Sequence, residues 1–248
     1  MFSWVELFTT DTEGAKRFYH ELFGWQTDGT SSTVTLAGKA VAAISEQPTP
    51  QRSAAVPPHW LSYVTVASAE GSAARAADLG GTVHAGPFEV GDAGRVAIVA
   101  DPTGAMLGLW EARSSIGAEI VNDPGCLTSN ELATNDVDAA SRFYEGLLGW
   151  SISQVGAADG PRYWLIRHDG AAEGRNGGIR ELGPSESGVP PAWVPYFTVH
   201  SIDDTLVRAG ELDGATLVGA TEIPAGRFAA IRDPQGAVFS IFEGPVDD

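Results

Sequence analysis

The chain has 248 residues, 43% of them hydrophobic, and its 32 acidic residues outnumber its 15 basic ones to give a net charge of −17. Such an excess of negative charge repels phosphate backbones and anionic lipid, so we expect neither nucleic acid nor a membrane as a partner. Cys126 is the single cysteine, which excludes an internal disulfide, and we expect a cytoplasmic protein without a signal peptide.

The chain begins with a predicted strand at 4–8, where apolar and polar side chains alternate. Thr10–Glu13 has the spacing of a capping box, and the apolar residues after it recur at helical intervals. This pattern stops at Gly24, a residue typical of helix C-termini. Two short strands are predicted next, at 33–37 and 40–44.

A proline-rich bridge at 47–58 leads into a strand predicted at 60–66 and a helix at 69–79. The turn sequence Asp101–Gly104 joins the last two strands of this part of the chain. The remaining strands of the first half are predicted near 82–84, 94–100 and 105–110.

The second half repeats the first. Asp11–Trp25 returns as Asp136–Trp150 with 8 of 15 residues identical, and Gly94–Glu111 returns as Gly226–Glu243 with 8 of 18 identical. The two offsets are nearly equal, so a whole structural unit is duplicated.

The second half has its own details around the repeated motifs. Its first hairpin is longer, with a turn predicted near 156–161 and a strand at 163–167. A second bridge at 183–195 ends on a strand at 193–199, and a helix follows at 202–212. Each half is therefore predicted to consist of two βαβββ modules.

This order defines the expected architecture. We predict an α+β protein with four βαβββ modules in two tandem domains, residues 1–112 and 126–248, joined by a linker at 113–125.

The modules resemble a known family. Phe-Tyr…Leu-Gly-Trp on the first helix and Asp-Pro-x-Gly before the last strand, both present twice, resemble the vicinal-oxygen-chelate superfamily of glyoxalase I, bleomycin-resistance proteins and extradiol dioxygenases. The resemblance implies glyoxalase/bleomycin-resistance-type domains, in which paired modules form half-open barrel clefts. The concave side of such a cleft holds a metal or an organic ligand.

Enzymes of this superfamily hold a divalent metal with His and Glu side chains from the first and last strands of their modules. The resemblance places the equivalent positions at Trp4, Leu61, Gly108, Ser129, Val194 and Ser240. None of these is a histidine or a carboxylate, and the remaining ligand strand offers only alanine at 42 and 43 or glycine at 177 and 178. Three or four converging donors are needed, so we expect no metal and no other cofactor.

The same strands predict what the clefts contain instead. Residues at i and i+2 share a strand face, so Glu6 and Glu131 point the same way as Trp4 and Ser129. The predicted ligand-binding set is Trp4, Glu6, Tyr63, Trp110, Ser129, Glu131, Tyr196, Ser240 and Phe242. An aromatic cleft with one carboxylate in each half suits a planar or apolar organic molecule that carries a cationic or hydrogen-bond-donating group.

Glu6 and Glu131 are also the candidate catalytic residues, because a positioned carboxylate can act as a general base. In a purely structural alternative the aromatic residues are core that closes the half-barrel, and the two glutamates cap backbone groups or pair with Arg95 and Arg227, which also repeat.

Two functions follow from these residues. The first is a metal-free protein that binds a small organic molecule and sequesters a toxic or aromatic compound. The alternative is a lyase, isomerase or oxygenase that uses Glu6 or Glu131, or an unconventional metal site. Pairing of the two halves within one chain suits a monomer, and a homodimer is the other expected state.

Overall fold

The computed structural model describes residues 1–29, 31–156, 162–168 and 175–245. The predicted turn near 156–161 therefore lies largely outside the described residues. None of the helices in the described ranges is long and apolar enough to cross a membrane.

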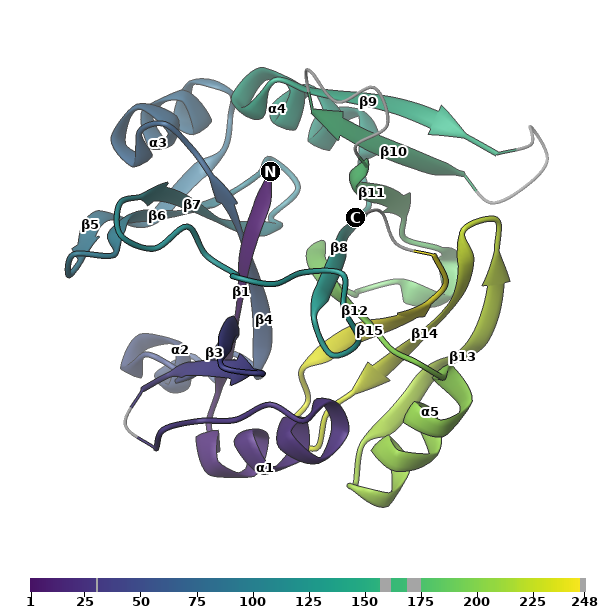
Figure 1. Ribbon diagram of the computed structural model, residues 1–248. Coiled ribbons are helices and arrows are strands. Elements are labelled where there is room, and N and C mark those ends of the chain that lie inside the picture. Colours follow the sequence, from purple (N-terminus) through teal and green to yellow (C-terminus); the bar gives the residue numbers. More distant parts are fainter. Residues whose placement is uncertain (30, 157–161, 169–174, 246–248) are drawn as a thin grey trace. The chain divides into compact units, whose positions relative to one another are not determined.

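The first half follows the predicted order of elements, with one unpredicted short helix in the bridge at 47–58 (Figure 1). Its helices are α1 (Thr12–Phe23), α2 (Thr49–Ser53) and α3 (Ala69–Asp78). Its strands are β1 (Phe2–Thr9), β2 (Thr33–Leu36), β3 (Lys39–Glu46), β4 (His59–Thr65), β5 (Thr82–Val90), β6 (Gly94–Ala100) and β7 (Met106–Ala112).

The second half repeats this order with one more strand in the described residues. Its helices are α4 (Val137–Leu148), the 3-10 turn η1 (Pro184–Glu186) and α5 (Ile202–Glu211). Its strands are β8 (Leu127–Thr134), β9 (Trp150–Val155), β10 (Tyr163–His168), β11 (Arg175–Glu181), β12 (Ala192–Thr198), β13 (Ala215–Ile223), β14 (Gly226–Arg232) and β15 (Val238–Glu243).

Each half of the sequence forms one sheet. The first sheet has the strand order β2-β3-β1-β4-β7-β6-β5, and the second has the order β13-β14-β15-β12-β8-β11-β10-β9. Both sheets are open, with two edge strands each, which fits two tandem domains of the predicted class. The strand that corresponds to β9 is reduced in the first half to a bridge between Gln26 and Thr35.

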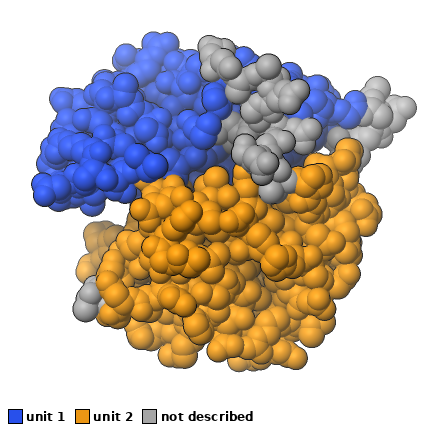
Figure 2. All heavy atoms as spheres, in the orientation of Figure 1, with its two compact units in different colours: residues 1–3, 62–116, 129–194 blue, residues 4–61, 117–128, 195–248 orange. Residues whose placement is uncertain are grey.

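Packing groups the modules differently from the sequence repeat. Residues 1–3, 62–116 and 129–194 form one compact unit, called unit 1, and residues 4–61, 117–128 and 195–248 form unit 2 (Figure 2). Each unit therefore combines one module from each half of the sequence. The boundaries 1–112 and 126–248 describe the repeat, and as domain limits they stay a prediction.

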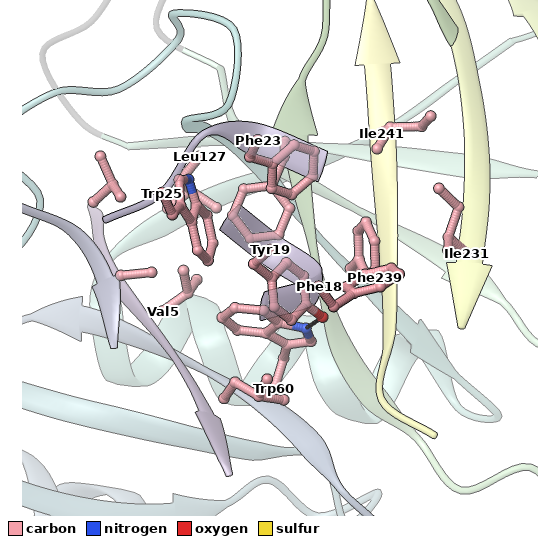
Figure 3. Close-up of a cluster of buried hydrophobic side chains, with 14 of the residues drawn as sticks. Val5, Phe18, Tyr19, Phe23, Trp25, Trp60, Leu127, Ile231, Phe239 and Ile241 are labelled. Atoms are coloured by element: carbon pink, nitrogen blue, oxygen red, sulfur yellow. Dashed lines mark hydrogen bonds between the residues drawn. The ribbon is translucent and has the colours of Figure 1, made fainter. Parts of the chain in front are cut away.

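The repeated aromatic motifs form the core of each unit. In unit 2, Trp60 Nε1 donates a hydrogen bond to the Tyr19 hydroxyl at 3.3 Å (Figure 3). That hydroxyl donates to Asp233 Oδ2 at 3.0 Å. Burial, followed by the charge of Asp233, raises the pKa of Tyr19 well above its usual value. The Phe-Tyr motif of one half thus meets the Asp-Pro-x-Gly turn of the other half.

Unit 1 places the corresponding three residues together. Trp193 Nε1 donates to the Tyr144 hydroxyl at 2.8 Å, and Asp101 is the neighbouring carboxylate that, after burial, raises the pKa of Tyr144. All three side chains are buried. Trp60 and Trp193 belong to the core clusters, whereas Tyr63 and Tyr196, three residues further along the same strands, belong to neither.

Two local predictions were wrong. The N-cap of α1 is Asp11, whose carboxylate accepts the Gly14 amide, and not the Thr10 of the proposed capping box. The strand predicted near 82–84 extends to Val90. It contains Pro87, which β5 accommodates because it is the last strand of its sheet.

Candidate functional site

The predicted ligand-binding residues lie on the sheet face opposite the two cores. In β1, Val5 and Leu7 are fully buried in the unit 2 core, whereas Trp4 and Glu6 alternate with them and are only partly buried. In β8, Leu132 belongs to the unit 1 core and Glu131 points to the other face. None of the nine predicted residues belongs to either core cluster.

Glu6 lies in unit 2, on the strand that pairs in parallel with β3. Its backbone register partner is Ala43, and its Oε1 atom accepts a hydrogen bond from Ser45 Oγ at 2.5 Å. Ser45 stands two residues beyond Ala43 and therefore on the same face of β3. The first-half glutamate is thus held by a neutral hydroxyl.

Glu131 lies in unit 1 and is held by a cation. Arg180 Nε donates to Glu131 Oε1 at 3.1 Å, and the Glu131 side chain is only 13% exposed. The same guanidinium binds both oxygens of Glu186 at 2.8 Å, in the fork geometry typical of strong arginine–carboxylate pairs. Glu186 belongs to η1 and also accepts the Gly183 amide at 2.9 Å.

The contact with Arg180 makes the Glu186 carboxyl a stronger acid. Hydrogen bonding by the Arg180 guanidinium, opposed in part by burial, lowers the pKa of Glu186. Glu186 is therefore ionised near neutral pH, and the chain Glu131–Arg180–Glu186 is an ion-pair network.

Ser45 and Arg180 occupy the same position in the two halves. Glu6 is in register with Ala43 and Phe8 with Ser45, whereas Glu131 is in register with Gly178 and Ala133 with Arg180. The predicted set did not include either residue. Side chains two residues apart share a strand face, so counting two residues on from Ala43 and from Gly178 would have found both.

Tyr63 and Trp110 lie in unit 1 on paired strands. Tyr63 is in register with Gly108, and its ring fills the space that a side chain at 108 would occupy. Trp110 is 9% exposed, and its Nε1 donates to the Ser115 carbonyl at 3.0 Å. The structure therefore brings these two aromatic side chains to one sheet face.

Tyr196, Ser240 and Phe242 lie together in unit 2. Tyr196 is in register with Ser240, and Phe242 is in register with Phe228 of the next strand. The rings of Tyr196 and Phe228 are 6.2 Å apart between centroids, within the range of aromatic pairs. Phe228, which is not among the nine predicted residues, extends this aromatic patch.

The predicted pairing of the two glutamates with Arg95 and Arg227 was wrong. Arg95 and Arg227 approach Glu111 and Glu243, with N–O distances of 3.9 and 3.4 Å. Those two carboxylates also accept the first amides of α3 and α5, at 2.8 and 2.7 Å. The repeated arginines thus belong to a helix-capping arrangement on the core side.

The described residues do not fit the family's metal centre. No group of three or more His, Cys, Asp or Glu side chains in the described ranges converges to hold an ion. At two of the expected ligand positions, Gly108 and Gly178, the rings of Tyr63 and Tyr163 fill the space where a ligating side chain would lie. Aromatic surface thus occupies positions that the family uses for metal donors.

Comparisons with known proteins agree with this fold. The model of the Glyoxalase/Bleomycin resistance protein/Dioxygenase superfamily matches residues 2–109 and 127–241. The "Putative glyoxylase CFP32" of Mycobacterium tuberculosis is 40% identical over 97% of this chain and 94% of its own length. The "Anthracycline biosynthesis protein DauV" of a Streptomyces species is 33% identical over 97% of this chain and 92% of its own.

Solved structures show the same architecture. The Mn(II)-bound glyoxalase from Novosphingobium aromaticivorans superposes with a TM-score of 0.65 at 15% identity, over 98% of this chain and 81% of that one. The 2,3-dioxygenase LapB from Pseudomonas sp. KL28 has a TM-score of 0.62 at 15% identity, over 100% of this chain and 93% of that one. At this identity the likeness concerns the fold alone.

Proposed function

The chain belongs to the glyoxalase/bleomycin resistance protein/dioxygenase superfamily, and we propose that it binds a small aromatic molecule without the metal centre of that superfamily. The observation that carries this proposal is the replacement of metal donors by aromatic rings. Tyr63 covers Gly108 and Tyr163 covers Gly178, at positions where a metal enzyme would need a donor.

The remaining residues on this sheet face suit a planar organic ligand. Trp4, Trp110, Tyr196 and Phe242 supply aromatic surface, which stacks well on flat apolar molecules. Glu6 and Glu131 supply one carboxylate in each half, and a carboxylate orients a ligand that carries a cation or a hydrogen-bond donor. Sequestration of a toxic or aromatic compound requires only binding, so it needs no reactive side chain or metal in addition to these residues.

The names of two relatives support an aromatic ligand. DauV and the "Anthracycline biosynthesis protein DnrV" of Streptomyces peucetius, 32% identical over 97% of this chain, concern anthracyclines, which are polycyclic aromatic compounds. Both matches cover 97% of this chain, so the matched region includes the strands that carry this sheet face.

The second candidate function is catalysis. The 40% identical relative is named a glyoxylase, which favours an enzyme of the lyase, isomerase or oxygenase type. In that case the candidate bases are Glu6, which accepts a hydrogen bond from Ser45, and Glu131, which forms an ion pair with Arg180.

One set of measurements on untagged protein distinguishes binding without metal from catalysis. Elemental analysis after dialysis against chelator gives the metal content, and calorimetric titration with an anthracycline gives its affinity. We expect less than about a tenth of an equivalent of metal and an affinity unchanged by the chelator. Stoichiometric metal that survives dialysis would contradict the proposal.

Catalysis is tested with matched variants of the two glutamates. Glu6→Gln and Glu131→Gln keep the shape of the side chain and remove its charge. If the bound compound is recovered unchanged from wild-type protein, sequestration is supported. Turnover that is lost in Glu6→Gln or in Glu131→Gln would favour the enzyme.

A further inference from the structure

Unit 2 has a cavity on its core side, away from the predicted ligand-binding residues. It measures about 260 Å³ and lies where the end of α1, the segment before β8 and the start of α5 meet. Helices α1 and α5 lie side by side at this place (Figure 1). The apolar walls of the cavity are formed by Leu22, Phe23, Pro124 and Val199. An engineered cavity of roughly 150 Å³ holds benzene, so this space accommodates one six-membered ring with a short substituent.

The wall at Pro124 and Gly125 is held in place by hydrogen bonds. The Gly125 amide donates to the Thr198 carbonyl at 2.8 Å, and the Gly125 carbonyl accepts the indole N–H of the buried Trp25 at 2.7 Å. A wall fixed in this way lowers the cost of ordering the site when a ligand binds.

The polar side of the cavity favours a cation over an anion. This side is formed by His200, Ser201, Asp204 and Thr205. The amides of Asp204 and Thr205 already donate to the hydroxyl and the carbonyl of Ser201, at 3.2 and 3.1 Å. Glu243 accepts the Ile202 amide at 2.7 Å, so the start of α5 has its own carboxylate in the place of a bound anion.

The charges along α5 support the same preference. Asp204 brings a carboxylate to the exposed rim of the cavity. Arg208, one helical turn further along, forms ion pairs with two other carboxylates, those of Glu21 and Glu211. Carboxylates therefore outnumber cations around this rim, and the resulting potential attracts a positively charged ligand.

The equivalent place in unit 1 shows that the fold does not require the rim pair, His200 and Asp204. The N-cap of α3, Ser68, accepts the Gly71 amide at 3.1 Å, just as Ser201 caps α5. Ala67 and Gly71 stand at the positions of the rim pair. The cap thus forms without an imidazole or a carboxylate beside it.

We propose that this cavity is a binding site for a small organic amine. The apolar body of the amine lies against Leu22 and Val199. Its ammonium group pairs with Asp204 and donates a hydrogen bond to the His200 ring. The site is separate from the sheet face of the proposed function, and neither depends on the other.

The test is a heteronuclear NMR titration of the full chain with benzylamine. Benzyl alcohol and benzoate are the neutral and anionic controls of similar shape. The Gly125 amide and the Trp25 indole N–H report on the cavity wall. We expect benzylamine to shift both signals and to saturate below about 10 mM, with at least about fivefold weaker binding of both controls.

Variants of two neighbouring carboxylates provide the decisive comparison. Asp204→Asn keeps the shape of the side chain and removes its charge, so it should weaken benzylamine binding about fivefold and leave benzyl alcohol unchanged. Asp203→Asn is the matched control, because the Asp203 carboxylate binds Arg227 at 3.1 Å and is not among the residues that line the cavity. It should leave the affinity for benzylamine unchanged.

Saturable binding that Asp204→Asn weakens and Asp203→Asn does not would support the inference. It is overturned if benzylamine does not saturate by about 10 mM, if benzoate binds equally well, or if the two variants have the same affinity. Shifts confined to residues of the sheet face, such as Tyr196, would also overturn it. The metal and anthracycline measurements test the proposed function separately, so the two failures are distinguishable.

Discussion

The two faces of the sheets differ in how far the two halves of the chain agree. On the core side, Trp60, Tyr19 and Asp233 in unit 2 have direct counterparts in unit 1. On the opposite face, the equivalent glutamates have different partners, a serine in one half and an arginine in the other.

Burial explains this difference. The hydroxyls of Tyr19 and Tyr144 are on fully buried side chains, and a buried polar group without a partner costs about 1–3 kcal/mol. Few residue types can supply those partners at the required positions. Arg180 is 34% exposed, so water compensates for part of any change at that position. The exposed face can therefore differ between halves while the fold stays the same.

The largest expected effect tests the likeness of the two cores. Trp60→Ala and Trp193→Ala each remove a buried ring, and each should lower the free energy of unfolding by about 4 kcal/mol. Urea denaturation measures both values. Val207→Ala, at a 65% exposed position of α5, is the control and should change stability by less than about 0.5 kcal/mol. A large difference between the two tryptophan variants would show that the cores are not equivalent.

The next effect tests the difference on the opposite face. Arg180→Met should cost about 2 kcal/mol, because it leaves Glu131 and Glu186 without their shared cation. Ser45→Ala removes one neutral hydrogen bond and should cost about 1 kcal/mol or less. The salt dependence of stability distinguishes the two variants, since only the arginine network is screened by salt. Equal costs with equal salt dependence would contradict the comparison.

A smaller effect uses the matched helix caps. Asp11 accepts the Gly14 amide and Asp136 accepts the Ala139 amide, both at 2.9 Å. Asp11→Ala and Asp136→Ala should each cost about 1 kcal/mol in thermal or urea unfolding. Thr10→Ala is the control for the rejected capping box and should cost less than either.

The sequence allowed much of the fold to be predicted because the repeat made weak signals visible twice. Amphipathic periodicity located α1 and α4, and Gly24 ends its helix in the left-handed conformation, as expected. Alternation along β1 and β8 placed Glu6 and Glu131 on the face away from the core. These features depend on residues close together in the chain.

The parts that could not be predicted depend on contacts between distant segments. The contacts of Ser45 and Arg180 depend on the parallel register of β1 with β3 and of β8 with β11. Glu186 joins the network only because η1 forms within a bridge that local patterns do not resolve. The regrouping of the modules into units 1 and 2 likewise follows from packing, which the order of the repeats does not reveal.

The smallest effect we predict is a pH dependence from Asp233. Burial raises its pKa above 3.8, although the amides of Gln235, Gly236 and Ala237 and the Tyr19 hydroxyl favour its charged form. The folded protein therefore holds this proton more tightly than the unfolded chain does. The resulting contribution to stability is complete below about pH 4 and is lost as the pH rises through the raised pKa.

Asp233→Asn removes the titration and keeps an oxygen that accepts the same amides. The free energy of unfolding of wild-type protein, minus that of Asp233→Asn, should therefore fall as the pH rises from about 4 toward neutrality. Urea denaturation of both proteins at several pH values measures this difference, and subtraction cancels the titration of all other groups. A difference that rises with pH would mean that hydrogen bonding to the carboxylate outweighs its burial.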